Sequence, residues 1–172
     1  IQTGEGLEGT VEFFPEEGKY HFDGHRKCGV SLSPTEAERL GGICPVCGKK
    51  LTMGVDHRVE QLADREEGFV KEDGKKYESL VPLSEVIAAC MGYSTASKKV
   101  QGCFEQMLQK LGTEFDILRN IPAEDIKSCA GERIAEGIEN VRTGHVKRIP
   151  GYDGEYGKIE LFESSGYSFM NE

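Results

Sequence analysis

Short elements are indicated in the first third of the chain. β-Branched and aromatic residues on both sides of a Pro/Glu/Gly cluster predict a β-hairpin over residues 9–22. Ser33, Pro34 and Glu36 then supply an N-cap, a proline at the first helical position and a capping-box acid, which predicts a helix of about two turns. A second short helix is expected over residues 56–64.

Beyond residue 82 the apolar positions follow the period of an α-helix. In the run 97–111 they recur at offsets of 0, 3, 4, 7, 8 and 11, which gives a single stripe on one helix face. These residues are Val100, Cys103, Phe104, Met107, Leu108 and Leu111. Further helices are expected over residues 82–91, 114–120, 123–128 and 132–142. Strand and turn signals return in residues 144–163.

Two pairs of Cys and His residues give the strongest chemical signal in the sequence. His25 and Cys28 stand in HRKCG, Cys44 and Cys47 stand in CPVCG, and fifteen residues lie between the pairs. Two intervening residues let a tight turn aim both ligands at one ion, and the following glycine lets backbone amides turn toward the thiolates. This arrangement predicts one structural Zn²⁺ per chain, held by three thiolates and one imidazole with no open position.

Other interpretations of the cysteines and histidines remain open. His21 competes with His25 as the fourth ligand, although only His25 mirrors the spacing of the second pair. Disulfides or a redox CxxC motif are the alternatives to zinc, but the strand and helix context of a thioredoxin motif is missing. The remaining cysteines, expected to be buried thiols of the helical part, are Cys90, Cys103 and Cys129.

Together these elements predict an α+β protein with two lobes. The N-terminal lobe, residues 1–66, combines the β-hairpin with a zinc-ribbon-like site, and a helical lobe follows over residues 77–150. The acidic, glycine-containing loop 65–76 is the expected boundary, and residues 151–172 are expected to form a strand and turn tail. In the helical lobe, IKSCAGERIAEGI partly resembles a helix-hairpin-helix, but Cys129 replaces its expected first glycine and plain helix packing is the alternative.

Composition is that of an ordinary soluble globular protein. The chain has 172 residues, of which 37% are hydrophobic and 30% charged. No stretch approaches the roughly 18 consecutive apolar residues of a membrane helix, and the start lacks the features of a signal peptide, so a cytoplasmic protein without membrane contact is expected. The start at Ile1, in a Gly-rich polar run, indicates a fragment of a longer protein.

The net charge of −9 argues against general coating of polyanions, but basic residues gather in two places. One patch follows the second Cys pair, and the other lies in residues 140–152, which hold no acid. The candidate DNA contacts are Lys49, Lys50, His57, Arg58, Arg142, Lys147 and Arg148. A solvated surface without a ligand is the alternative for both patches.

A series of motifs along nearly the whole chain resembles one known family. EGKYHFDGHRKC, SLSPTEA, GICPVCGKKLTMGVDHRVEQLADR, LVPLSEVIAA and PGYDGEYGKI occur in this order, similar to the C-terminal half of the endonuclease Q family and its bacterial relatives. The resemblance implies a zinc-binding domain and a helical domain that follow an N-terminal PHP-type metallohydrolase domain. It implies cleavage of DNA on the 5' side of deaminated bases, such as uracil and hypoxanthine, and of abasic sites.

The resemblance places the catalytic domain outside this sequence. Four His, one of them assigned to zinc, do not supply the ligands of a PHP metal cluster, so a non-catalytic DNA-recognition portion is expected. Its expected partners are damaged DNA, double or single stranded, and the N-terminal metallohydrolase domain. Lys19, Tyr20 and His21 are candidates for the edge of a pocket for an extruded base, with strand packing as the alternative for Tyr20. A zinc-stabilised protein-interaction module without nucleic-acid contact is the alternative function, and the acidic net charge favours it.

Overall fold

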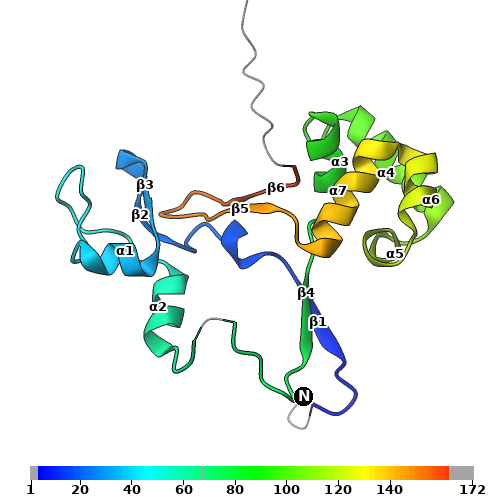
Figure 1. Ribbon diagram of the computed structural model, residues 1–172. Coiled ribbons are helices and arrows are strands. Elements are labelled where there is room, and N and C mark those ends of the chain that lie inside the picture. Colours follow the sequence, from blue (N-terminus) through cyan, green and yellow to red (C-terminus); the bar gives the residue numbers. More distant parts are fainter. Residues whose placement is uncertain (1–3, 67, 163–172) are drawn as a thin grey trace, which may run out of the picture. The chain divides into compact units, whose positions relative to one another are not determined.

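The structure is a computed structural model that describes residues 4–66 and 68–162 (Figure 1). Within these residues it has seven α-helices and three two-stranded sheets, which confirms the α+β class. Backbone contacts divide the chain into two compact units. Of the described residues, the first unit contains 4–66, 68–79 and 148–158, and the second contains 80–147 and 159–162.

The first unit is made of short strands and helices. Its elements are β1 (Gly9–Glu12), η1 (Pro15–Glu17), β2 (Asp23–His25), η2 (Arg26–Cys28), β3 (Val30–Leu32), α1 (Pro34–Arg39), α2 (Val55–Leu62) and β4 (Lys76–Ser79), where η denotes a 3-10 turn. The capping box predicted for α1 is present, because the amide of Glu36 donates to Ser33 Oγ and the amide of Ser33 donates to Glu36 Oε2. Local sequence signals therefore place α1 correctly.

The β-hairpin predicted over residues 9–22 is wrong. β1 pairs in parallel with β4, far along the chain, with Gly9 opposite Lys76. The antiparallel pair is formed instead by β2 and β3, and the turn cluster that indicated the hairpin forms η1. Alternating residues and turn residues predict that strands occur, but which strands pair depends on the path of the chain between them.

The second unit is helical. Its helices are α3 (Leu83–Met91), α4 (Lys98–Leu111), α5 (Glu114–Arg119), α6 (Ala123–Ala130) and α7 (Glu132–Thr143), and the chain continues through β5 (Lys147–Ile149) and β6 (Lys158–Glu160). The helices follow the predicted ranges closely. Gly131, at φ 94°, is the single residue between α6 and α7, which pack against each other. This is the segment that partly resembles a helix-hairpin-helix.

The helices of the second unit enclose an aliphatic core of their own. Its fully buried side chains are Leu83, Val86, Ile87, Val100, Met107, Ile117, Ile126 and Ile138. In the stripe predicted for α4, Val100 and Met107 are fully buried and the other four residues are partly buried. Burial of one such side chain contributes about 1.5–3 kcal/mol, so this core stabilises the unit without any metal. Among the described residues no helix has the length and hydrophobicity needed to cross a membrane.

Candidate metal centre and basic surfaces

Two similar turns of the first unit carry the four predicted metal ligands. His25 ends β2 and Cys28 ends η2, and Gly29 follows at φ 64° with its amide bonded to the carbonyl of Arg26. In the second turn the amide of Gly48, at φ 70°, donates to the carbonyl of Cys44. The left-handed backbone at both glycines strains any other residue, which explains the glycine after each pair.

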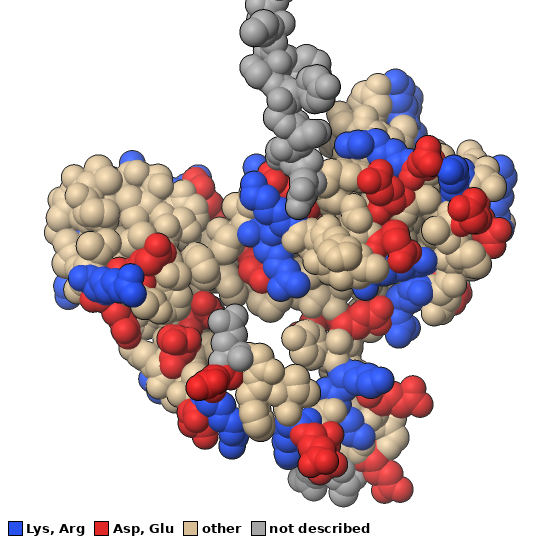
Figure 2. All heavy atoms as spheres, viewed as in Figure 1, with Lys and Arg blue, Asp and Glu red and all other residues tan. Residues whose placement is uncertain are grey.

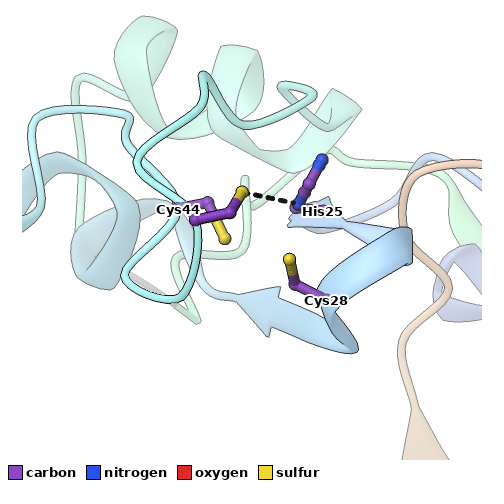
Figure 3. Close-up of side chains that lie close together, drawn as sticks. His25, Cys28 and Cys44 are labelled. Carbon is purple, nitrogen blue, oxygen red and sulfur yellow. Dashed lines mark hydrogen bonds between the residues drawn. The ribbon is translucent and has the colours of Figure 1, made fainter.

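The side chains of His25, Cys28, Cys44 and Cys47 converge on one point. Their donor atoms all lie within 4.8 Å of one another, and Cys47 Sγ lies 3.4 Å from His25 Nδ1. Figure 3 shows His25, Cys28 and Cys44 reaching toward the same space from β2, η2 and the second turn. Tetrahedral zinc with bonds of about 2.3 Å to sulfur places its ligands about 3.8 Å apart, so a small contraction closes the shell. The cluster fits a metal ion.

The thiols of the cluster differ in their electrostatic surroundings. Burial works against ionisation of Cys44, but the backbone amides of Cys47 and Val46 donate to its sulfur and bring its pKa down to about 7. Burial raises the pKa of Cys28 to about 11, and the neighbouring thiols of Cys47 and Cys44 add to the rise. A metal ion replaces the proton of each thiol that it binds, so metal binding at this cluster releases protons.

A buried polar pair fastens α2 to the strand that carries His25. The carboxylate of Asp23 is fully buried, and its oxygens lie 2.6 Å from the amide of Gly54 and 2.7 Å from His57 Nδ1. His57 is 8% exposed and is the one buried residue of α2. The ring of His57 is enclosed and its Nδ1 lies beside Asp23 inside the unit, while a contact between His57 and DNA remains a prediction.

Sequence reasoning missed a second support of the metal site. Asp153, at φ 42°, accepts the amide of Arg26 at 2.6 Å and the hydroxyl of Thr52 at 2.6 Å. These two bonds hold the pKa of Asp153 below its ordinary value. Arg26 stands between the ligands His25 and Cys28, so Asp153 fixes the backbone of the first turn. The run PGYDGEYG signals a turn, but nothing local indicates that it returns to the metal centre.

The predicted basic residues differ in what their side chains do. Lys49, Lys50 and Arg58 are exposed on the first unit. Arg142 instead donates to the backbone carbonyls of Ile117, Leu118 and Ile121, and its side chain is only 16% exposed. The guanidinium of Arg142 joins α7 to α5, while a contact between Arg142 and DNA remains a prediction.

Two further predicted contacts have acidic partners. Lys147 Nζ lies 3.1 Å from Glu160, and Arg148 lies 3.2 Å from Glu16 while its guanidinium stacks over the ring of Phe14. Both remain partly exposed, so a phosphate would have to compete with a carboxylate. Figure 2 shows that Lys and Arg side chains are interspersed with Asp and Glu over the visible face.

The predicted base-pocket residues lie on the segment before β2. Tyr20 is exposed, and the ammonium of Lys19 lies 5.7 Å from its ring centroid. His21 is partly buried and stacks on Phe22, and the group of side chains that could hold a metal ion includes His25 and not His21.

The three cysteines of the helical unit lie apart from the metal cluster. Cys90 is buried, which raises the pKa of its thiol to about 11. Cys103 and Cys129 are only partly buried, so the prediction of buried thiols is confirmed for Cys90 alone.

Comparison with known proteins identifies relatives along most of the chain. Residues 82–145 match the family of the MJ0043 C-terminal domain. The sequence is 34% identical over 149 residues to the uncharacterized protein MJ0043 of Methanocaldococcus jannaschii and 29% identical over 147 residues to the uncharacterized protein YqxK of Bacillus subtilis. These alignments cover 86% and 85% of this chain but only 18% and 34% of the two relatives.

Two solved structures share the fold. The lesion-specific endonuclease PfuEndoQ from Pyrococcus furiosus matches with a TM-score of 0.78 at 33% identity. Endonuclease Q in complex with a 27-mer duplex substrate, which has an abasic lesion at the active site, matches with a TM-score of 0.74 at 32% identity. Each match covers 89% of this chain and 38% of the other chain. This chain is therefore an endonuclease Q-like domain, similar to the lesion-specific endonuclease PfuEndoQ, and its residues 82–145 match the MJ0043 C-terminal domain.

Proposed function

We propose that this chain is the non-catalytic, zinc-containing DNA-recognition portion of an endonuclease Q-like DNA repair nuclease. The observation that carries the proposal is the similarity to endonuclease Q over 89% of the chain at 32% and 33% identity, which includes a complex with a damaged duplex. The longer protein acts at deaminated bases, uracil and hypoxanthine, or at abasic sites. An N-terminal metallohydrolase domain supplies its catalysis, and the domain limits 1–66, 77–150 and 151–172 remain predictions.

The role proposed for zinc is structural. Within residues 4–66 and 68–162, the one group of His, Cys, Asp or Glu donors close enough for a metal is the cluster of His25, Cys28, Cys44 and Cys47. Four protein ligands fill a tetrahedral shell and leave no position for a water or a substrate. The metal then holds the two turns together, and the core of Ala37, Cys44 and Leu51 packs beside it.

The proposed DNA contacts are the exposed basic residues of the first unit together with two basic residues of β5. Lys49 and Lys50 follow the second metal turn and Arg58 lies on α2, so a folded zinc site presents all three. Lys147 and Arg148 are retained as weaker contacts because each has a carboxylate partner. Lys19, Tyr20 and His21 are proposed at the edge of the base pocket. Contacts to phosphates position the duplex, whereas the pocket distinguishes the lesion.

The test is binding of the zinc-loaded chain to a labelled duplex with one deoxyuridine, compared with the unmodified duplex, at several salt concentrations. Replacing Lys49 and Lys50 by Ala is expected to lower the slope of log affinity against log salt by about two, because two phosphate contacts are lost. The control replaces Lys71 and Lys75, which are exposed in the acidic loop, and removes the same charge. An unchanged slope in the variant without Lys49 and Lys50 would remove these two lysines from the proposal.

One observation favours the second candidate function, a protein-interaction module. Val55, Val59 and Leu62 are all exposed and recur along α2 at helical spacing. In this alternative the stripe packs against a partner protein, and the zinc site only stabilises the unit that presents it. Absence of salt-dependent DNA binding by the zinc-loaded chain at low salt would favour this alternative.

A further inference from the structure

The return segment, residues 150–157, is fixed against the segment that precedes β2. Its backbone bonds run from Gly151 to the carbonyl of Glu16, from Gly154 to that of Lys19 and from Gly157 to that of Glu17, at 2.8, 2.9 and 3.1 Å. Both segments belong to the first unit, in which Figure 1 draws the return segment in orange. Side chains on these two segments are therefore held on a rigid backbone.

Two exposed tyrosine rings share one cation on this surface. The ammonium of Lys19 lies 5.7 Å from the ring centroid of Tyr20 and 5.7 Å from that of Tyr156. Tyr20 is 46% exposed and Tyr156 is 73% exposed. Each distance lies within the range of a cation–π contact, so Lys19 arranges both rings around its charge. Tyr156 was not among the candidate residues from the sequence, because only the fold brings residue 156 beside residue 19.

The charged neighbours of the rings are largely paired. Arg26 Nε lies 3.1 Å from Glu155, and the carboxylate of Asp153 accepts from the Arg26 amide and from Thr52. A β-carbon at Gly154 would lie 3.7 Å from the Tyr20 hydroxyl and 3.9 Å from Arg26 Nη1, so both groups stand beside the same glycine. The carboxylates of Asp153 and Glu155 thus bond to Arg26 and Thr52, while the ammonium of Lys19 lies near the two rings.

We propose that Lys19, Tyr20 and Tyr156 form a stacking platform for unpaired nucleotides of a DNA strand. This inference rests on the proposed function and names the form of DNA that the surface takes. Base faces are hidden inside a duplex and become available to aromatic rings only when the strands separate. The rings stack on the bases, and Lys19 lies between them to meet a phosphate. The rigid return segment keeps the rings in place, so little conformational entropy is lost on binding.

The test compares the affinity of the zinc-loaded chain for a labelled oligothymidylate and for a duplex without unpaired bases. Tyr156→Ala and Tyr20→Ala are each expected to weaken oligothymidylate binding about 5-fold to 150-fold, the value of stacking one base. Duplex binding is expected to stay unchanged, and Tyr156→Phe is expected to bind as the unsubstituted chain does because the ring remains. Both tyrosines are exposed, so these variants are expected to stay folded, and their zinc content checks this.

A matched control lies in the helical unit. Tyr93 is also 46% exposed, and the ammonium of Lys99 lies 4.4 Å from its ring centroid. Tyr93→Ala is expected to leave oligothymidylate binding unchanged. Equal losses in Tyr93→Ala and Tyr156→Ala, or no loss in Tyr156→Ala and Tyr20→Ala, would overturn the platform. Salt-dependent duplex binding without oligothymidylate binding refutes the platform alone, whereas binding of neither refutes the proposed function as well.

Discussion

The buried contact between Asp23 and His57 is expected to govern the stability of the first unit, which holds the candidate metal ligands. α2 buries only His57, so apolar packing contributes little to its attachment. The Asp23 carboxylate pairs with that ring, and the amides of Val55 and Asp56 add two backbone bonds to the segment before β2. Asp23→Ala leaves the amide of Gly54 and the ring of His57 buried without a partner. Each orphaned group costs about 1–3 kcal/mol, so a loss of about 2–6 kcal/mol in the free energy of unfolding is expected. Asp23→Asn keeps the shape and one acceptor and is expected to lose less.

The assay is urea unfolding of the cobalt-substituted chain, because the absorbance of the cobalt–thiolate bonds reports unfolding of the first unit alone. Trypsin provides a second measurement, since release of α2 exposes the peptide bond after Arg58 to cleavage. Asp64→Ala removes an exposed carboxylate and is expected to change stability by less than about 0.5 kcal/mol. If Asp23→Ala unfolds at the same urea concentration as Asp64→Ala and resists trypsin equally, the reasoning about the buried pair is refuted.

Two further predictions concern the helical unit and the metal ligands. Gly102→Ala is expected to stabilise α4 by about 1 kcal/mol, because an added β-carbon there meets nothing within 4 Å. Gly137→Ala is expected to destabilise the chain, because its β-carbon would lie 2.7 Å from Cys90 Sγ. Thermal unfolding compares the Gly102→Ala and Gly137→Ala variants, and equal changes in their stability would contradict the close contact at Gly137. Cys44→Ser is expected to lower the zinc content measured by mass spectrometry and to leave the helical unit folded, whereas Cys103→Ser should retain one zinc; full zinc content in Cys44→Ser would exclude the proposed ligand set.

The sequence by itself determined the parts that depend on local chemistry. The Ser33 and Glu36 capping box and the periodic stripe on α4 act through neighbours within a turn or two, so their helices were predictable. The metal cluster was also predictable, because the spacing of each ligand pair and its glycine defines a turn. In each case the informative residues lie close together along the chain, and no knowledge of long-range pairing was needed.

The tertiary structure alone decided what lies across long separations in the chain. β1 pairs with β4 and not with its neighbour, and Asp153 supports a turn formed more than a hundred residues earlier. His57 and Arg142 looked like surface cations, yet each bonds to groups inside its own unit. A histidine or arginine that bonds inside its unit has the same chemistry as one on the surface, so the residue type alone does not distinguish the two positions. Burial and long-range contacts depend on how the whole chain folds. For this reason only the structure could distinguish charged side chains that hold elements together from those exposed to solvent.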